Sequence, residues 1–169
     1  MADLTGAALA SWARLTWTAW ALALAPAPAA AADEIAGLWL SDDGEGAVEI
    51  APCGAARCGR IVWLKSPTTA EGRPVTDANN PDPALRSREV CGLRIVTGLK
   101  PQSDGGWDEG RIYDPEEGKS YDVAMRREGA DALKVTGYIG TKMLSETHVW
   151  RRAPRTLARC GKARAGSDG

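Results

Sequence analysis

The chain contains eight short apolar stretches and no long segment with a convincing helical period. Clusters of Gly, Asp and Pro separate these stretches, which is typical of consecutive hairpins in all-β proteins. The predicted strands are Gly37–Leu40, Gly46–Ala51, Arg60–Lys65, Leu93–Leu99, Trp107–Asp114, Lys119–Arg126, Ala132–Ile139 and Thr147–Arg152. The sequence therefore predicts an all-β fold, an eight-stranded antiparallel up-and-down barrel.

Tryptophans at the two ends of this region indicate how such a sheet would close. Trp39 lies in the first predicted strand, and the pair Trp150-Arg151 lies in the last. We expect the Arg151 guanidinium to lie across the Trp39 indole, because this cation–π contact is stronger when it is shielded from water. The barrel-closing pair Trp39 and Arg151 would plug one end and leave the other end as the open mouth of a cup for a small ligand.

Side-chain alternation in two strands predicts which residues face the interior. The inward set consists of Tyr121, Val123, Met125, Leu133, Val135 and Ile139. In the strand Trp107–Asp114 the apolar and charged residues do not fall on opposite faces. Trp107 and Tyr113 share a face with Glu109 and Arg111. If that aromatic face points inward, charged side chains enter the barrel with it.

One long connection, from Ser66 to Glu89, has no strand pattern and joins the third predicted strand to the fourth. Long ordered connections in compact domains are uncommon and often functional, so this loop could cover the barrel mouth as a lid. Asp77 and Asn80 lie within it. We interpret them first as turn formers whose side chains cap nearby backbone amides.

The first segment of the chain is typical of an export signal. An apolar stretch from Leu15 to Leu24 precedes the small residues Ala29–Ala32, which predicts a signal peptide over residues 1–32. A membrane anchor is the alternative, but this apolar stretch is shorter than the ~20 residues that a spanning helix needs. We therefore expect one barrel domain over residues 33–152, a polar C-terminal tail over 153–169, a periplasmic or secreted location, and no membrane span after cleavage.

The four cysteines of an exported chain suggest disulfides, and four allow three connectivities. Cys53 and Cys58 flank a short loop between two predicted strands, so a bridge between them is the first choice. The pairing of Cys91 and Cys160 stays open. A zinc site is not favoured, because the spacing is Cys-x4-Cys and His148 is the only histidine.

Charge and composition restrict the partners. The net charge is −1 and no basic stripe appears, which argues against a nucleic-acid surface. We expect no cofactor and no metal. The expected partner is a small amphipathic ligand, and a second envelope protein is the alternative.

Several motifs in a fixed order resemble one known family. They are Gly37-Leu38-Trp39, Cys53-Gly54, Cys58-Gly59-Arg60-Ile61-Val62-Trp63-Leu64, Asp77 with Asn80-Pro81-Asp82-Pro83, Arg86-Ser87-Arg88, Cys91-Gly92-Leu93, Gly110-Arg111-Ile112-Tyr113-Asp114-Pro115, Gly118-Lys119-Ser120-Tyr121, Leu133-Lys134-Val135-Thr136-Gly137-Tyr138-Ile139-Gly140 and Trp150-Arg151. From Gly37 to Arg151 the chain resembles the bacterial domain of unknown function 2147 family. The resemblance implies an exported protein, periplasmic in Gram-negative bacteria, with a lipocalin-like barrel and no established activity.

The chain departs from that family near its end. Members tend to have Thr-x-Thr-Trp-Thr-Arg, whereas this chain has Thr147-His148-Val149-Trp150-Arg151. The Trp-Arg pair is kept, but His148 is a poor candidate for a shared catalytic residue. Cys160 lies beyond the matched region.

Aromatic and arginine side chains are the candidates for lining a ligand cavity. The candidate ligand-binding residues are Trp63, Arg86, Arg88, Trp107, Arg111, Tyr113 and Tyr121, with Tyr138 weaker because alternation places it opposite the apolar set. Aromatic rings supply contact area, and a guanidinium can hold a carboxylate or phosphate with two hydrogen bonds. This predicts an amphipathic ligand that could be anionic. The alternative is that the aromatic rings only fill the core.

Two other function classes stay open. One is an envelope interaction or structural module without a small ligand. The other is an acid/base enzyme on the same barrel, with Glu109 and Tyr113 as the acidic groups. The chain has no Gly-x-Ser-x-Gly or His-Glu-x-x-His motif, and a Ser-His-Asp triad could use only His148. We therefore assign no catalytic residue.

Overall fold

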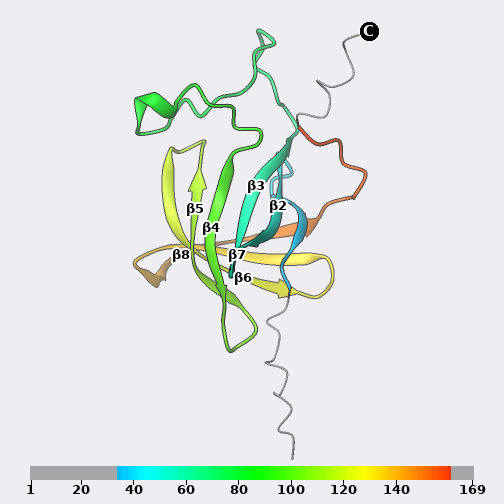
Figure 1. Cartoon of the computed structure of the whole chain (residues 1–169), viewed down its shortest axis with the longest axis vertical. Helices are drawn as coiled ribbons and strands as arrows, with labels where there is room; N and C mark the ends of the chain where they lie inside the picture. The colour runs from blue at the N-terminus through cyan, green and yellow to red at the C-terminus, as the bar shows by residue number, and fades with distance from the viewer. Residues whose placement is uncertain (1–33, 161–169) are drawn as a thin grey trace, which may run out of the picture.

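Every strand that the structure describes pairs antiparallel with its neighbours in sequence, and the last strand returns to the first to close a barrel (Figure 1). The computed structural model describes residues 34–160. The strands are β1 (Gly37–Leu40), β2 (Gly46–Cys53), β3 (Ala56–Leu64), β4 (Arg94–Pro101), β5 (Trp107–Asp114), β6 (Lys119–Glu128), β7 (Ala132–Ile139) and β8 (Thr141–Arg152). The predicted eight-stranded antiparallel up-and-down barrel is confirmed.

The predicted signal peptide and the last part of the predicted tail lie outside the described residues. Residues 153–160, which the sequence assigned to a polar tail, pack against the barrel. The Ala153 amide donates to the Leu38 carbonyl at 2.9 Å, and the Cys160 amide donates to the Val62 carbonyl at 2.7 Å. We call residues 153–160 the C-terminal strap.

The barrel interior is filled by apolar side chains from all eight strands. Val123 and Met125 of β6 and Leu133 and Val135 of β7 are buried, as their alternation predicted. Ile139 is instead 64% exposed, so its predicted inward position is wrong. The reason is a shift in the β7–β8 register directly before Ile139, which moves the end of β7 out of the alternating pattern.

A second apolar cluster lies under the C-terminal strap, apart from the main core. Its buried members are Leu38, Ala47, Val62 and Ala153, and Leu40, Trp63 and Leu157 pack against them. The strap is fixed by a disulfide between Cys91 and Cys160, which resolves the pairing that the sequence left open. A double hydrogen bond from Arg159 to Glu49, at 2.7 and 2.8 Å, holds the strap against β2.

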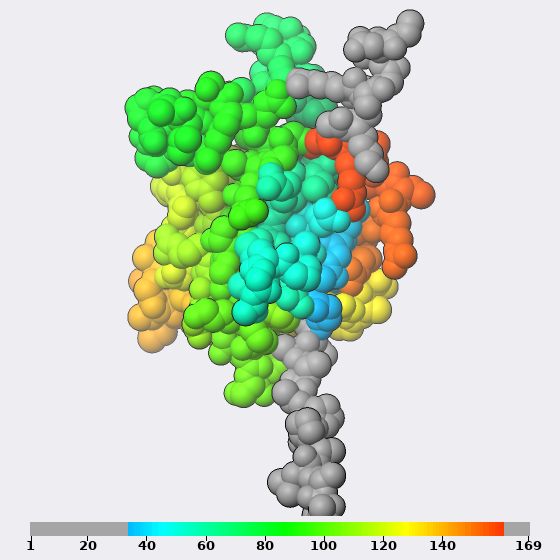
Figure 2. Space-filling model, viewed as in Figure 1, coloured from blue at the N-terminus to red at the C-terminus, as the bar shows by residue number. Residues whose placement is uncertain are grey.

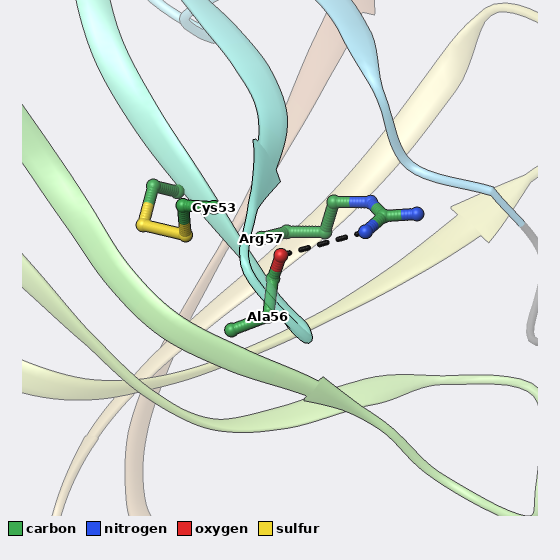
Figure 3. The surroundings of a disulfide bond; sticks show 4 residues. Cys53, Ala56 and Arg57 are labelled. Carbon is green, nitrogen blue, oxygen red and sulfur yellow. Dashed lines mark hydrogen bonds between the residues drawn. A yellow bond between two sulfur atoms is a disulfide. The ribbon is translucent and has the colours of Figure 1, made fainter.

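The predicted disulfide Cys53–Cys58 is confirmed. It lies beside the β2–β3 turn, where Arg57 Nη1 donates to the Ala56 carbonyl at 3.4 Å (Figure 3). The strand register pairs Cys53 with Ala56 and Ala51 with Cys58, so the two cysteines are diagonal neighbours rather than directly opposite. Their Cα atoms are 5.8 Å apart, within the range that a disulfide spans.

The long connection between β3 and β4 lies over one end of the barrel, at the top of Figure 1. It contains one short 3₁₀ helix, Pro83–Leu85, whose start is capped by the Asp82 side chain. Val90 of this loop is buried in the main core, and Val75 packs against that core. The predicted long loop between the third and fourth strands is therefore confirmed, and it is part of the packed structure.

Candidate functional site

Within residues 34–160, core side chains fill the barrel interior in which the sequence predicts a ligand cavity. The largest fully buried side chains include Trp39, Leu99, Met125 and Leu133. Ile35, which precedes β1, is also fully buried, at the end where the described chain begins. The sequence-based picture of a cup inside the barrel therefore does not match the packing.

Trp39 closes one end, but its covering arginine is not the one expected. The Arg152 guanidinium lies 3.9 Å from the Trp39 ring centre, and the Arg127 guanidinium lies 5.5 Å from it. Arg151 is exposed, so the prediction that it covers Trp39 is wrong. The register pairs Trp39 with Arg152 and Leu40 with Arg151, and alternate residues of a strand face opposite sides of the sheet.

Gly37 makes the approach of Arg152 possible. Its φ of 139° is one that other residues rarely adopt, and a Cβ there would collide with the Arg152 guanidinium. The Trp39 indole N–H donates to the Ile35 carbonyl at 2.9 Å, which satisfies its only polar group. The first-strand Gly-x-Trp motif thus serves barrel closure.

At the other end, the long loop is fastened to the barrel through a buried carboxylate. Asp77 has no exposed surface. Its Oδ1 accepts a 2.5 Å hydrogen bond from the Tyr113 hydroxyl, and its Oδ2 accepts from Asn80 Nδ2 and Arg88 Nε at 2.8 Å each. Asp77 and Asn80 therefore link the loop to β5, which is a larger role than the predicted turn formation.

The environment of Asp77 shifts two pKa values in opposite directions. Burial by itself raises the pKa of Asp77, but the hydrogen bonds from Tyr113, Asn80 and Arg88 outweigh burial and hold this pKa below its usual value. Burial and the neighbouring Asp77 carboxylate raise the pKa of the Tyr113 phenol. The group is thus an ionised carboxylate held by three donors.

The two arginines of the loop do not form the expected anion-binding site. Arg88 is engaged with Asp77 and lies 5.7 Å from the Tyr113 ring centre. Arg86 Nε donates to the Asn80 carbonyl at 2.8 Å. Both side chains, like Tyr113, are therefore engaged in contacts that hold the loop on the barrel.

A bulge in β5 explains why the inward and outward residues of this strand could not be assigned from the alternation of the sequence. The β5–β6 register shifts between Trp107 and Gly110, and Glu109 has a φ of 61°. Trp107 is consequently buried in the core, with the Arg57 guanidinium 4.7 Å from its ring centre. Arg111 is exposed and pairs with Asp122 at 2.8 Å. The predicted sharing of one face by Trp107 and Arg111 is therefore wrong.

The remaining predicted residues also have structural partners. Trp63 packs against the second cluster, outside the main core. The Tyr121 hydroxyl donates to Glu117, which raises the pKa of Tyr121 to about 12. Glu109 pairs with Lys100 at 2.9 Å while Tyr113 contacts Asp77, so the two acidic groups of the enzyme hypothesis are not brought together.

A groove of about 240 Å³ lies instead between the β4–β5 hairpin and strands β6 and β7. Its lining consists of Gln102, Asp104, Gly106, Trp107, Asp108, Ala124, Met125, Arg126, Glu128, Lys134, Thr136 and Lys142. Ala124 and Thr136 are opposite each other in the β6–β7 ladder, as are Arg126 and Lys134. These four alternate with the buried Met125 and Leu133, so they lie on the outer face of the sheet.

Most charges in the groove are already paired. Arg126 pairs with Asp104, and Lys142 pairs with Asp108. Asp108 also accepts from the Tyr138 hydroxyl at 2.8 Å. Burial raises the pKa of Asp108, but these donors outweigh it and lower the pKa, while burial and Asp108 together raise the pKa of Tyr138 to about 12.

Lys134 differs from its neighbours. It is half-buried, and within residues 34–160 its ammonium group forms no ion pair. Glu128 also lines the groove, but it is exposed and therefore solvated. A half-buried cation beside two neutralised charge pairs is a place where an anionic group gains a charge-assisted hydrogen bond. Of the residues that the sequence proposed for ligand binding, Trp107 lines this groove, whereas Lys134 was not among them.

No helix among residues 34–160 is long and apolar enough to cross a membrane. Within the same range, no group of three or more His, Cys, Asp or Glu side chains is placed to hold a metal ion.

The closed eight-stranded antiparallel barrel, plugged by Trp39, places the protein in the class of lipocalin-like barrels. A solved structure with a similar fold is protein HP1028 from the human pathogen Helicobacter pylori, described as belonging to the lipocalin family. The TM-score is 0.63 at 20% sequence identity, and the match covers 73% of this chain and 85% of that chain. Comparison with curated proteins gives no match.

The chain belongs to the family described as uncharacterized protein conserved in bacteria (DUF2147), whose model matches residues 37–152. The resemblance drawn from the sequence motifs is thereby confirmed. The matched range runs from the first residue of β1 to the last residue of β8.

Proposed function

We propose that the protein is an exported small-ligand-binding protein whose ligand binds in the outer groove, with an anionic group at Lys134. Small-ligand binding is supported by the lipocalin-like fold. The groove is supported by its concave shape and by the half-buried ammonium of Lys134, which forms no ion pair with the described residues. The packing of the barrel interior favours this outer location over an internal cavity.

The size and lining of the groove define the ligand class. A volume of about 240 Å³ lies below the roughly 300–1,000 Å³ of sites for drug-sized molecules, so the ligand is a smaller metabolite. Ala124 and the Thr136 methyl group offer apolar contact next to Lys134. The ligand is therefore amphipathic, with one carboxylate or phosphate and a short apolar body.

The two disulfides of the chain support the proposed export. Two disulfides join all four cysteines of the chain, and such bonds persist in oxidising compartments such as the periplasm. A periplasmic or secreted location also fits the apolar segment Leu15 to Leu24 followed by small residues.

Native mass spectrometry of protein purified from the periplasm, followed by calorimetry with small carboxylates and phosphates, tests the function. We expect Lys134→Gln to weaken binding of the best anion by about tenfold, because a charge-assisted hydrogen bond is lost, and Lys134→Arg to retain most of it. Lys65→Gln is the control, since Lys65 pairs with Glu45 and neither residue lines the groove.

The alternative is an envelope structural module, which the packed barrel and its two covered ends favour. Wild-type protein that retains no ligand and binds no anion of either class supports this alternative. An anion that binds Lys134→Gln as well as wild type shows that the groove assignment is wrong.

A further inference from the structure

Two arginines lie directly opposite each other on the outer wall of the barrel. Arg60 of β3 pairs with Arg94 of β4 in the strand register, and both side chains are exposed. The two strands lie side by side in Figure 1. Directly opposed residues of an antiparallel pair have Cβ atoms roughly 5 Å apart, and like charges at that spacing are destabilising.

A bulge in β4 turns Arg94 to the outer surface. From Gly59 to Arg60 the register moves by one residue in β3, whereas in β4 it moves by two, from Val96 to Arg94. Ile95 is therefore an extra residue, and it is buried in the main core together with Val96. Without the bulge, alternation would give Arg94 the inward side that Val96 has. The bulge thus brings the second guanidinium out beside the first.

The carboxylate on the other side of Arg60 does not neutralise this pair. Glu49 of β2 is opposite Arg60, but its two oxygens accept from Arg159 of the C-terminal strap at 2.7 and 2.8 Å. Figure 2 shows the end of this strap, in red, on the barrel surface next to β3. Arg60 instead donates to the Gly92 carbonyl, and within residues 34–160 neither Arg60 nor Arg94 forms an ion pair. The repulsion between the two arginines is therefore not relieved by a carboxylate of the described chain.

We propose that Arg60 and Arg94 together bind a phosphate group. A tetrahedral phosphate has enough oxygens to accept paired hydrogen bonds from both guanidinium groups, whereas a single guanidinium already occupies both oxygens of a carboxylate. The hydrogen bond to the Gly92 carbonyl uses one N–H of Arg60 and leaves the other donors of this side chain for the ligand. Neither arginine lines the groove at Lys134, so this is a second site.

The open position of the site favours a terminal phosphate, either inorganic phosphate or a phosphate monoester. Both arginines are exposed, so the protein contacts the phosphate group and leaves the rest of the ligand in solvent. A monoester carries a charge of about −2 near neutral pH and three free oxygens, which matches two guanidinium groups. The phosphodiester of a lipid headgroup has one charge and two free oxygens, so we expect it to bind less well.

Titration with inorganic phosphate at constant ionic strength, followed by NMR of the arginine Nε–H signals, tests the proposal. We expect saturable shifts at Arg60 and Arg94. Arg60→Gln and Arg94→Gln should each weaken binding by about tenfold, because the phosphate loses one of its two guanidinium partners. Arg94→Lys should recover only part of the affinity, since lysine keeps the charge but lacks the planar fork. Arg111→Gln is the matched control, because Arg111 is an exposed strand arginine that pairs with Asp122 at 2.8 Å.

Cosedimentation with phosphatidylglycerol vesicles tests the lipid headgroup as the other source of phosphate, and circular dichroism establishes that each variant is folded. Vesicle binding that Arg60→Gln and Arg94→Gln abolish, without a response to inorganic phosphate, supports the site and assigns it to a headgroup. The absence of both kinds of binding, or binding that neither substitution weakens, overturns the proposal. Lys134→Gln should leave the phosphate response of Arg60 and Arg94 unchanged, so this proposal and the proposed function fail independently.

Discussion

At the scale of single residues, the arginines near Trp39 should differ in how much each contributes to the stability of the fold. Arg152 and Arg127 lie over the fully buried Trp39 ring, whereas Arg151 is exposed. We expect Arg152→Ala to lower the free energy of unfolding by about 1–3 kcal/mol, because the buried indole loses its cover. Arg151→Ala should change it by less than about 0.5 kcal/mol. Urea denaturation followed by tryptophan fluorescence measures both, and equal losses would contradict this assignment.

The ionisation of Asp77 should make the free energy of unfolding depend on pH. Although burial raises its pKa, hydrogen bonds from Tyr113, Asn80 and Arg88 lower it overall, so the folded state favours the ionised form. A lowered pKa contributes stability above the unfolded value of about 3.9, and this contribution is lost as pH falls through the folded pKa. We therefore expect the wild type to lose stability below about pH 4.

Asp77→Asn isolates this contribution. The substitution leaves the donors of Tyr113 and Arg88 without a charged acceptor and should cost about 2–4 kcal/mol at neutral pH. The loss of stability between pH 5 and pH 3 should be smaller in the variant than in the wild type. Asp131→Asn, at an exposed position, is the control. An identical pH profile in wild type and Asp77→Asn would show that another carboxylate is responsible.

At the scale of elements, the long loop and the C-terminal strap are joined to each other as well as to the barrel. The Asn79 side chain donates to the Glu116 carbonyl at 2.6 Å, so the loop contacts the β5–β6 turn. Gly118 of that turn has a φ of 67°, and a Cβ there would collide with the Asn79 carbonyl. The Cys91–Cys160 disulfide then links the end of the loop to the end of the strap.

The two disulfides should differ in their effect on stability. Cys91–Cys160 joins residues separated by 69 positions, and Cys53–Cys58 joins residues separated by 5. The loss of loop entropy in the unfolded chain is greater for the longer loop, so replacing Cys91 and Cys160 by serine should cost about 2 kcal/mol more than replacing Cys53 and Cys58. Thermal unfolding of the two double variants under oxidising conditions measures the difference. A larger loss for the short loop would contradict it.

Several elements could be predicted from the sequence and others could not. Strands with one buried face alternate cleanly, so β6 and β7 were found with their inward residues Val123 and Leu133. β8 was expected from Thr147 but begins at Thr141, because residues 141–147 are exposed on both faces and carry no alternation. The β5 bulge at Glu109 reversed the expected position of Arg111, since one extra residue changes the face of every following side chain.

The candidate site could not be found from the sequence for a related reason. Lys134 lies on the polar side of an alternating strand, where a solvated charge is the usual interpretation. The groove around it is bordered by the β4–β5 hairpin, which lies far from Lys134 in sequence. Asp77 was likewise interpreted as a turn former because its burial depends on Tyr113 in a distant strand.

At the scale of the whole molecule, the proposed export would define the mature chain that folds. We expect the mature protein to begin at or near Asp33, because the small residues Ala29–Ala32 suit a signal peptidase. N-terminal sequencing of periplasmic material measures this end. Recovery of the uncleaved chain in the membrane fraction would contradict the proposed location.

The seam between β1 and β8 joins the first and last strands of the barrel through Trp39, Leu40 and their two partners. During synthesis the β2–β3 hairpin can form early, whereas β1 has no second neighbour until Arg152 has left the ribosome or, if the chain is exported as proposed, the export channel. The inner face of the sheet therefore stays uncovered until the chain is nearly complete. We expect the protein to depend on an aggregation-preventing chaperone during its passage, and to close only after release.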